Sequence, residues 1–260
     1  MCRPSARAHA PNTRRRNRQA EAQTEQHNKP GGPCRRPNGH LNTMLHLQEI
    51  KAGIKPGVEL VAVSKYHPAE AIQQAYDQGQ RVFGESRVQE LQAKRLALPQ
   101  DIRWHFIGHL QPNKVKYIAP YISLIHAVDS LKLLAEIEKQ AAKVQRTIPC
   151  LLELHLAQEE TKYGLTPAEC TALLEAGEWR QMTHVKLCGL MCMASNTNDT
   201  AQIRREFHTA YTFFRETKAR FFASDPDFCQ RSWGMSHDYR LAMDEGATMV
   251  RIGSAIFDGE

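Results

Sequence analysis

From residue 44 onward, the sequence alternates between strand-like and helix-like segments that are joined by short connections. The clearest strand, Val58–Lys65, is apolar along nearly its whole length, which is typical of a parallel-sheet strand buried on both faces. Proline stands where the first turn of a helix tolerates it, at Pro68 and Pro167, and glycine stands where helices end, at Gly79 and Gly177. We therefore expect an α/β fold built from repeated strand–helix units.

Eight segments have strand character: Val58–Lys65, Arg81–Glu85, Arg103–Gly108, Leu124–Val128, Ile148–Leu156, Val185–Met193, Ser232–Met235 and Thr248–Ile252. Seven segments between them have helix character: Pro68–Gln78, Arg87–Leu98, Asn113–Ile118, Ser130–Gln145, Pro167–Ala176, Thr200–Phe222 and His237–Glu245. This alternation over about 215 residues predicts a single (β/α)8 TIM-type barrel. An open, doubly wound sheet is the alternative that the pattern leaves.

The net charge of +6 is concentrated in residues 1–43, which hold eight Arg and one Lys against two Glu. This segment is rich in Arg, Pro, Asn, Gln and Gly, so we expect a disordered basic tail that precedes a barrel domain at residues 44–260. Because the composition changes abruptly at Met44, we also expect translation to start there. The remainder carries a net charge of −1, so no nucleic-acid partner is expected.

Composition also limits the class of protein. Hydrophobic residues make up 42% and charged residues 24% of the chain, and no apolar run approaches the length of a bilayer span, so we expect no membrane association. The seven cysteines are scattered and form no CxxC pair, which indicates reduced thiols in a cytoplasmic protein. His105 and His109 lie at a strand end without an HExxH pattern, so no metal site is predicted.

Chemically active side chains collect at the ends of the predicted strands. Lys65 ends the first strand, where barrels place their active sites, and desolvation there would favour the neutral, nucleophilic amine. The alternative is a lysine that only extends into solvent. Ser236, Gly253 and Ser254 follow the seventh and eighth strands, where barrels often bind phosphate through hydroxyl and backbone N–H groups. Taken singly, each of these residues would also suit an ordinary turn.

The order of the strand-end motifs resembles that of the YggS/PROSC family of pyridoxal phosphate homeostasis proteins, which are similar to the N-terminal barrel of alanine racemase. The resemblance covers about Val58 to Phe257 and does not include the tail. It is carried by Val61-Ala62-Val63-Ser64-Lys65, Phe83-Gly84-Glu85, Trp104-His105-Phe106-Ile107-Gly108-His109-Leu110-Gln111 with Asn113-Lys114, Gly234-Met235-Ser236 with Asp238, and Val250-Arg251-Ile252-Gly253.

The resemblance implies a site for pyridoxal 5′-phosphate (PLP). Lys65 would hold the cofactor as a Schiff base, and Arg251 would face the pyridine nitrogen. The phosphate would be held by Ser236, Gly253 and Ser254, and the site would include Met235 and Ser86. Ser86 stands where the family usually has asparagine. A permanently charged guanidinium disfavours protonation of the ring nitrogen, which makes the ring a poorer electron sink.

The function that the resemblance implies is intracellular PLP homeostasis, by buffering and supplying the cofactor, without strong catalytic activity. Alanine racemases have a second domain that supplies a tyrosine acid/base, whereas this chain ends at Glu260 and shows only Lys65 as a proton-transfer group. Two alternatives stay open: a racemase-like PLP enzyme, and an aldolase-type barrel in which Lys65 attacks a sugar-phosphate carbonyl. The expected partners are PLP and PLP-requiring apo-enzymes, and the resemblance implies a monomer.

Overall fold

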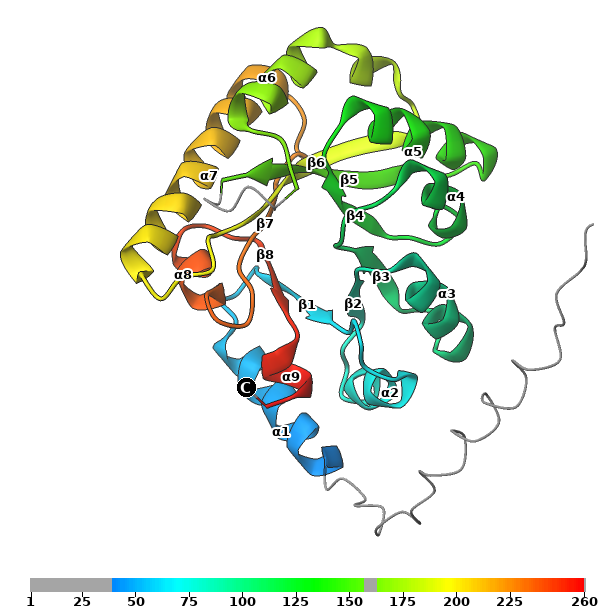
Figure 1. Ribbon diagram of the computed structural model, residues 1–260, viewed down its shortest axis with the longest axis vertical. Helices are drawn as coiled ribbons and strands as arrows, with labels where there is room; N and C mark the ends of the chain where they lie inside the picture. The colour runs from blue at the N-terminus through cyan, green and yellow to red at the C-terminus, as the bar shows by residue number, and fades with distance from the viewer. Residues whose placement is uncertain (1–38, 157–162, 260) are drawn as a thin grey trace, which may run out of the picture. The chain divides into compact units, whose positions relative to one another are not determined.

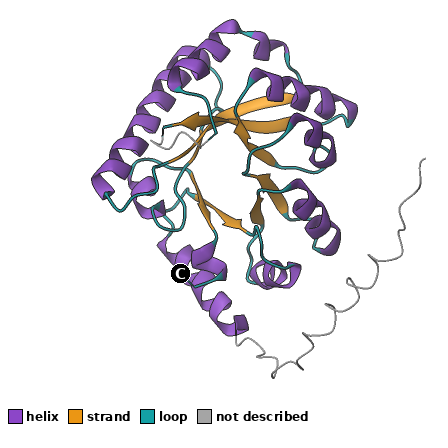
Figure 2. Ribbon diagram, viewed as in Figure 1, coloured by secondary structure: helices purple, strands orange, loops and turns teal. Residues whose placement is uncertain are grey.

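The computed structural model describes residues 39–156 and 163–259. Within these residues, eight parallel strands close into a barrel in chain order, and the helices surround it (Figures 1 and 2). The first and last strands complete the ring by pairing with each other, with Leu60 opposite Val250. The predicted TIM-type barrel is therefore confirmed, and the open sheet is excluded.

The strands are β1 (Glu59–Val63), β2 (Val82–Glu85), β3 (Arg103–Phe106), β4 (Leu124–Val128), β5 (Ile148–His155), β6 (Val185–Met193), β7 (Gln230–Ser232) and β8 (Met249–Ile252). The α-helices are α1 (Gly39–Gly53), α2 (Ala69–Asp77), α3 (Val88–Ala97), α4 (Val115–Ile118), α5 (Leu131–Lys143), α6 (Pro167–Ala176), α7 (Thr200–Phe221), α8 (Tyr239–Asp244) and α9 (Ser254–Phe257). Two 3-10 helices, η1 (Pro112–Lys114) and η2 (Glu178–Gln181), lie in the connections.

Local signals place several helix ends correctly. The Ser130 hydroxyl accepts a hydrogen bond from the backbone of Leu133 at the start of α5. Helix α6 begins with a capping box between Thr166 and Glu169, and it ends at Gly177, whose φ of 76° is left-handed. These ends are fixed by interactions within a few residues, so the sequence alone predicts them.

Strand β7 is displaced from its predicted position. The prediction was 232–235, whereas the strand runs from Gln230 to Ser232 and overlaps the prediction only at its last residue. Gly234 has a φ of 93°, which takes the chain out of the extended conformation. Upstream, the Arg231 guanidinium lies over the Phe214 ring and donates from Nε to the Gly246 carbonyl, so a polar residue is accommodated in the strand.

The N-terminal boundary differs from the prediction as well. Helix α1 begins at Gly39, within the segment that was expected to be a disordered tail and before the expected domain start at residue 44. The predicted disordered tail otherwise lies outside the described residues. Within the described ranges, no helix combines the length and the apolar character that a membrane crossing requires.

Two hydrophobic layers hold the barrel together. The outer layer packs the strands against the helices, with fully buried side chains such as Phe83, Ile125 and Ile137. The inner layer fills the barrel and consists of Val61, Val82, Leu124, Ala127, Leu151, Met191 and Met249. Because side chains alternate along a strand, the residue two positions after each inner-layer residue also points inward and lies closer to the C-terminal mouth.

Candidate functional site

A cavity of about 460 Å³ lies at the C-terminal mouth of the barrel. Its walls are largely formed by the segments that follow β1, β2, β3, β7 and β8, which is where barrels of this type carry their active sites. All seven residues that were predicted to hold the cofactor line this cavity: Lys65, Ser86, Met235, Ser236, Arg251, Gly253 and Ser254. The fold thus brings together residues that are spread over most of the barrel sequence.

Lys65 lies on the cavity wall, but it is not the desolvated amine that was expected. Strand β1 ends at Val63, and Lys65 is exposed in the turn that follows. The next residue, Tyr66, has a φ of 69°, a left-handed conformation that non-glycine residues adopt at a cost. The amine therefore projects from a turn whose unusual backbone must be held by its surroundings.

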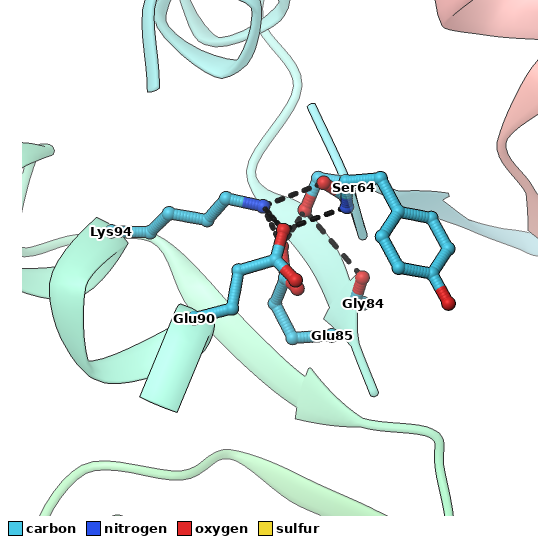
Figure 3. Close-up of polar contacts among 6 residues, drawn as sticks. Ser64, Gly84, Glu85, Glu90 and Lys94 are labelled. Carbon is cyan, nitrogen blue, oxygen red and sulfur yellow. Dashed lines mark hydrogen bonds and ion pairs between the residues drawn. The ribbon is translucent and has the colours of Figure 1, made fainter. Parts of the chain in front are cut away.

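A largely buried network holds this turn at Ser64 and Tyr66, the two neighbours of Lys65. Figure 3 shows its members Ser64, Glu85, Glu90 and Lys94. The Lys94 amine donates to the backbone carbonyl of Ser64 at 2.6 Å and to the Glu85 carboxylate at 2.7 Å. The Ser64 hydroxyl donates to the same Glu85 oxygen at 2.6 Å. Glu90 accepts from Lys94 at 2.6 Å and from the backbone N–H of Tyr66 at 2.7 Å. Ser64 and Tyr66 are thereby tied to helix α3, and the residue between them is fixed.

The electrostatics of the network depend on Lys94. The Glu85 side chain is fully buried, and burial raises the pKa of its carboxyl, while the hydrogen bonds from Lys94 and Ser64 act in the opposite direction. The Lys94 side chain is only 7% exposed. An ion pair buried to this degree requires both partners, because either charge alone would remain desolvated.

Arg251 forms part of the cavity floor and is held from below. It is 4% exposed, and its Nη1 donates to the backbone carbonyl of Ser232 at 2.6 Å and to the Ser232 hydroxyl at 2.7 Å. Its Nη2 donates to the Cys192 carbonyl at 3.0 Å. These bonds to β6 and β7 fix the plane of the guanidinium at the base of the cavity.

Two histidines extend this polar cluster into the barrel. His126 Nδ1 lies 2.9 Å from the Ser232 hydroxyl, and His126 Nε2 lies 3.1 Å from His105 Nδ1. Burial lowers the pKa of His105 to about 3 and lowers that of His126 well below its usual value. Both rings are therefore neutral at physiological pH and support Arg251 without adding charge.

The loops after β7 and β8 are joined at the cavity. The backbone N–H of Gly253 donates to the Ser236 hydroxyl at 3.2 Å. The turn that contains Ser236 is closed by Asp238, whose buried carboxylate accepts from the backbone of Met235 at 2.5 Å. Hydroxyl and backbone N–H groups from two loops thus meet on one wall, which is an arrangement suited to an oxyanion such as phosphate.

The sequence did not identify several other residues that line the cavity. His109 stacks on Tyr163 with a centroid distance of 3.9 Å, and its Nδ1 lies 3.1 Å from an Asp129 oxygen. His67 stacks on Phe257 at 4.6 Å. Glu153, Tyr66, His237 and Asp258 complete the titratable groups of the lining. Glu153 could have been singled out in the sequence, because it is a charged residue inside the apolar run of β5.

Comparison with known proteins places the chain among close relatives. The sequence model of the family described as "Alanine racemase, N-terminal domain" matches residues 44–260. A protein of Aquifex aeolicus named "Pyridoxal phosphate homeostasis protein" is 38% identical over 200 residues, which cover 76% of this chain and 86% of that protein.

Solved structures agree with this relationship. PipY of Synechococcus elongatus PCC7942, solved without PLP, matches with a TM-score of 0.78 and 36% identity, over 83% of this chain and 99% of PipY. The same protein solved with PLP bound matches with a TM-score of 0.75 and 35% identity over the same shares of the two chains. The barrel described above is therefore shared with a protein that holds PLP.

Proposed function

This chain belongs to the pyridoxal phosphate homeostasis protein family, and we propose that it binds PLP in the cavity at the barrel mouth and buffers or supplies the cofactor inside the cell. The observation that carries the proposal is the meeting of the seven predicted site residues around one cavity. A relative of 35% identity with PLP bound supports it. The cavity volume of about 460 Å³ is within the range of small-molecule sites.

Each wall of the cavity offers a group that suits one part of the cofactor. The Lys65 amine binds the aldehyde carbon as a Schiff base, which is the chemistry that this cofactor supplies when bound. Ser236, Gly253 and Ser254 hold the phosphate through hydroxyl and N–H groups. Arg251 faces the ring nitrogen, and its permanent charge disfavours ring protonation.

Met235 and Ser86 flank the same cavity. Ser86 packs against the loop after β3 so closely that a Cβ on Gly108 would lie 2.7 Å from the Ser86 Cβ. The absence of a side chain at Gly108 therefore allows the two loops to meet at the wall of the site.

The comparisons favour cofactor homeostasis over a racemase-like enzyme and over a Schiff-base aldolase, because the relatives carry the homeostasis name. Delivery of PLP to apo-enzymes, a monomeric state and a cytoplasmic location are parts of the proposal. The cysteines within the described residues are free thiols, which supports the reducing location: Cys150, Cys170, Cys188, Cys192 and Cys229.

Absorbance spectroscopy tests the proposal. Purified protein incubated with PLP is expected to show the visible absorbance of the bound cofactor, and Lys65→Ala is expected to lose it. Lys116→Ala is the matched control, because Lys116 is an exposed lysine on α4 outside the cavity. The loaded protein is expected to transfer PLP to an apo-enzyme and to exchange the α-proton of alanine slowly in deuterated water. Wild-type protein that stays colourless with PLP would contradict the proposal.

A further inference from the structure

Glu153 lies inside the barrel, in the layer directly above the inner hydrophobic layer. It follows the inward-facing Leu151 by two positions on β5, just as Arg251 follows Met249 on β8. Its neighbour in register on β6 is the apolar Met191. Glu153 is 3% exposed and lines the cavity together with Lys65 and Arg251.

The Glu153 carboxyl has no hydrogen-bond partner among the described residues, and its Oε2 atom is fully buried. Glu85 and Asp238, which are also buried near this mouth, each have one oxygen without a hydrogen-bond partner in the described part of the chain as well, but the other oxygen of each is bound. The second Glu85 oxygen accepts from Ser64 and Lys94, and the second Asp238 oxygen accepts from the backbone of Met235. A buried polar group without a partner is rare in folded proteins, and it requires a physical explanation. Because Glu153 faces a cavity, a ligand is the natural source of the missing partner.

The surroundings of Glu153 favour its neutral form. Burial, and secondarily the negative charge of Asp129 beyond the end of β4, raise the pKa of Glu153 to about 7, while the positive charge of Arg251 on β8 acts in the opposite direction. The β6 side chains nearest to Glu153 on the inner face, Met191 and Met193, are uncharged. A neutral carboxyl is a hydrogen-bond donor, which a carboxylate is not.

Most of the N–H groups of Arg251 are engaged by other residues of the protein. A guanidinium has five N–H groups, and three of those of Arg251 are used by Ser232 and Cys192 below the cavity. The cavity floor therefore contains Arg251, whose N–H groups are mostly hydrogen-bonded to the protein, and Glu153, whose carboxyl is not hydrogen-bonded to the described residues.

Resting on the proposed function, we propose that Glu153 contacts the ligand as a neutral acid and donates a hydrogen bond to an acceptor atom of bound PLP. Binding then keeps a proton on Glu153, so cofactor affinity is linked to pH through this residue. Glu153, on β5, is therefore a second determinant of PLP binding beside Arg251, which lies on β8.

The linkage has a definite sign and size. Above neutral pH the ligand-free carboxyl ionises, and binding must first restore its proton, so the dissociation constant rises with pH. With the ligand-free pKa at about 7, the Glu153 contribution between about pH 6 and about pH 8.5 is an increase of about thirtyfold in the dissociation constant. Titration of the PLP phosphate adds further pH dependence, which is common to all variants.

The test compares wild type with Glu153→Gln, which keeps the shape and a donor but cannot ionise. The dissociation constant of PLP for the ligand-free proteins is measured by tryptophan fluorescence across this pH range. We expect the wild-type constant to rise about thirtyfold more than that of the glutamine variant. Glu136→Gln on α5, which removes a carboxylate outside the cavity, is expected to follow wild type.

Proton uptake measured by calorimetry in two buffers gives an independent result, with wild type taking up more protons than Glu153→Gln when PLP binds at about pH 7.5. Glu153→Met, which removes the donor, is expected to weaken binding at every pH. Superimposable pH profiles of wild type and Glu153→Gln, or wild-type affinity that rises with pH relative to the variant, would overturn the inference. Absence of PLP binding to wild type at any pH would overturn the proposed function itself.

Discussion

The two chain neighbours of Lys65 decide where its amine lies. Ser64 and Tyr66 are each bound to helix α3, through Lys94 and Glu90, whereas the Lys65 side chain makes no hydrogen bond within the part of the chain that the structure describes. A reactive amine can therefore stay exposed to the ligand while its backbone stays rigid. The geometry of the site depends on residues that never touch the cofactor.

Lys94→Met tests this dependence. Methionine preserves most of the volume of lysine but leaves the fully buried Glu85 without its cation, so we expect the free energy of unfolding to fall by about 3 to 5 kcal/mol. Lys139→Met is the matched control, because the Lys139 side chain is 63% exposed and its pair with Glu136 contributes little. Urea unfolding measures both, and equal losses in the two variants would show that the network is not required.

The sequence identified the residues of the site unevenly, for a physical reason. Lys65, Ser236 and Gly253 follow strand ends, so their motifs alone predict where they meet. Glu153 is inside a strand, and only the closed barrel shows that its side chain faces the cavity and has no partner. The network of Lys94 was equally hidden, because its partners Ser64 and Glu85 lie outside its own helix and are not neighbours of Lys94 in the sequence.

Whole elements show the same division between local and distant causes. The ends of α5 and α6 were predictable, because Ser130 and Gly177 cap them within one turn. Strand β7 was misplaced, because its start depends on the packing of Arg231 against α7 and its end on Gly234. Neither the packing of Arg231 nor the backbone conformation of Gly234 produces a hydrophobic periodicity that the sequence would show.

Gly234→Ala tests how strictly the end of β7 is fixed. A Cβ there would lie 2.6 Å from the Ala242 Cβ and 2.9 Å from the Tyr239 Cα, and the φ of 93° disfavours any side chain. We expect a loss of about 3 kcal/mol in the free energy of unfolding and weaker PLP binding, because Met235 and Ser236 must shift.

Gly177→Ala provides the comparison for that variant. Gly177 is also left-handed, but its Cβ would meet the flexible end of Arg180 and, at an ordinary contact distance of 3.7 Å, the Glu175 carbonyl oxygen. Backbone strain of about 1 kcal/mol is therefore the expected cost. PLP affinity should not change, because Gly177 ends α6 away from the cavity lining. Urea unfolding of the two variants measures the backbone strain, and PLP titration measures whether the site is displaced. Unchanged PLP affinity in Gly234→Ala would show that the end of β7 does not control the position of Met235 and Ser236.

The closed barrel creates a polar interior that an open sheet would not enclose. His105, His126, Ser232 and Arg251 come from four different strands and form one hydrogen-bonded cluster that ends at the cavity floor. Eight strand–helix units predicted the closure, but the cluster depends on which inward-facing side chains share a layer. The same layer makes the stability of the whole molecule depend on pH.

The buried histidines and Glu153 act on that stability with opposite signs. Burial lowers the pKa of His105 to about 3, so the unfolded chain binds the proton first and stability falls as pH drops below about 6.5. His126 acts in the same direction. Burial raises the pKa of Glu153 to about 7, so the folded state binds that proton first and stability rises as pH drops from about 7 to about 4.5.

Substitution of Glu153 and substitution of a buried histidine should therefore change the pH dependence of the free energy of unfolding in opposite directions. Between about pH 6.5 and about pH 4.5, Glu153→Gln is expected to lose stability more steeply than wild type, by about 1.4 kcal/mol per pH unit, because the offsetting proton uptake is gone. His126→Gln is expected to lose stability less steeply by a similar amount. Urea unfolding at several pH values gives these slopes independently of any constant loss that each substitution causes. Parallel slopes in all three proteins would show that these groups keep their ordinary pKa values inside the barrel.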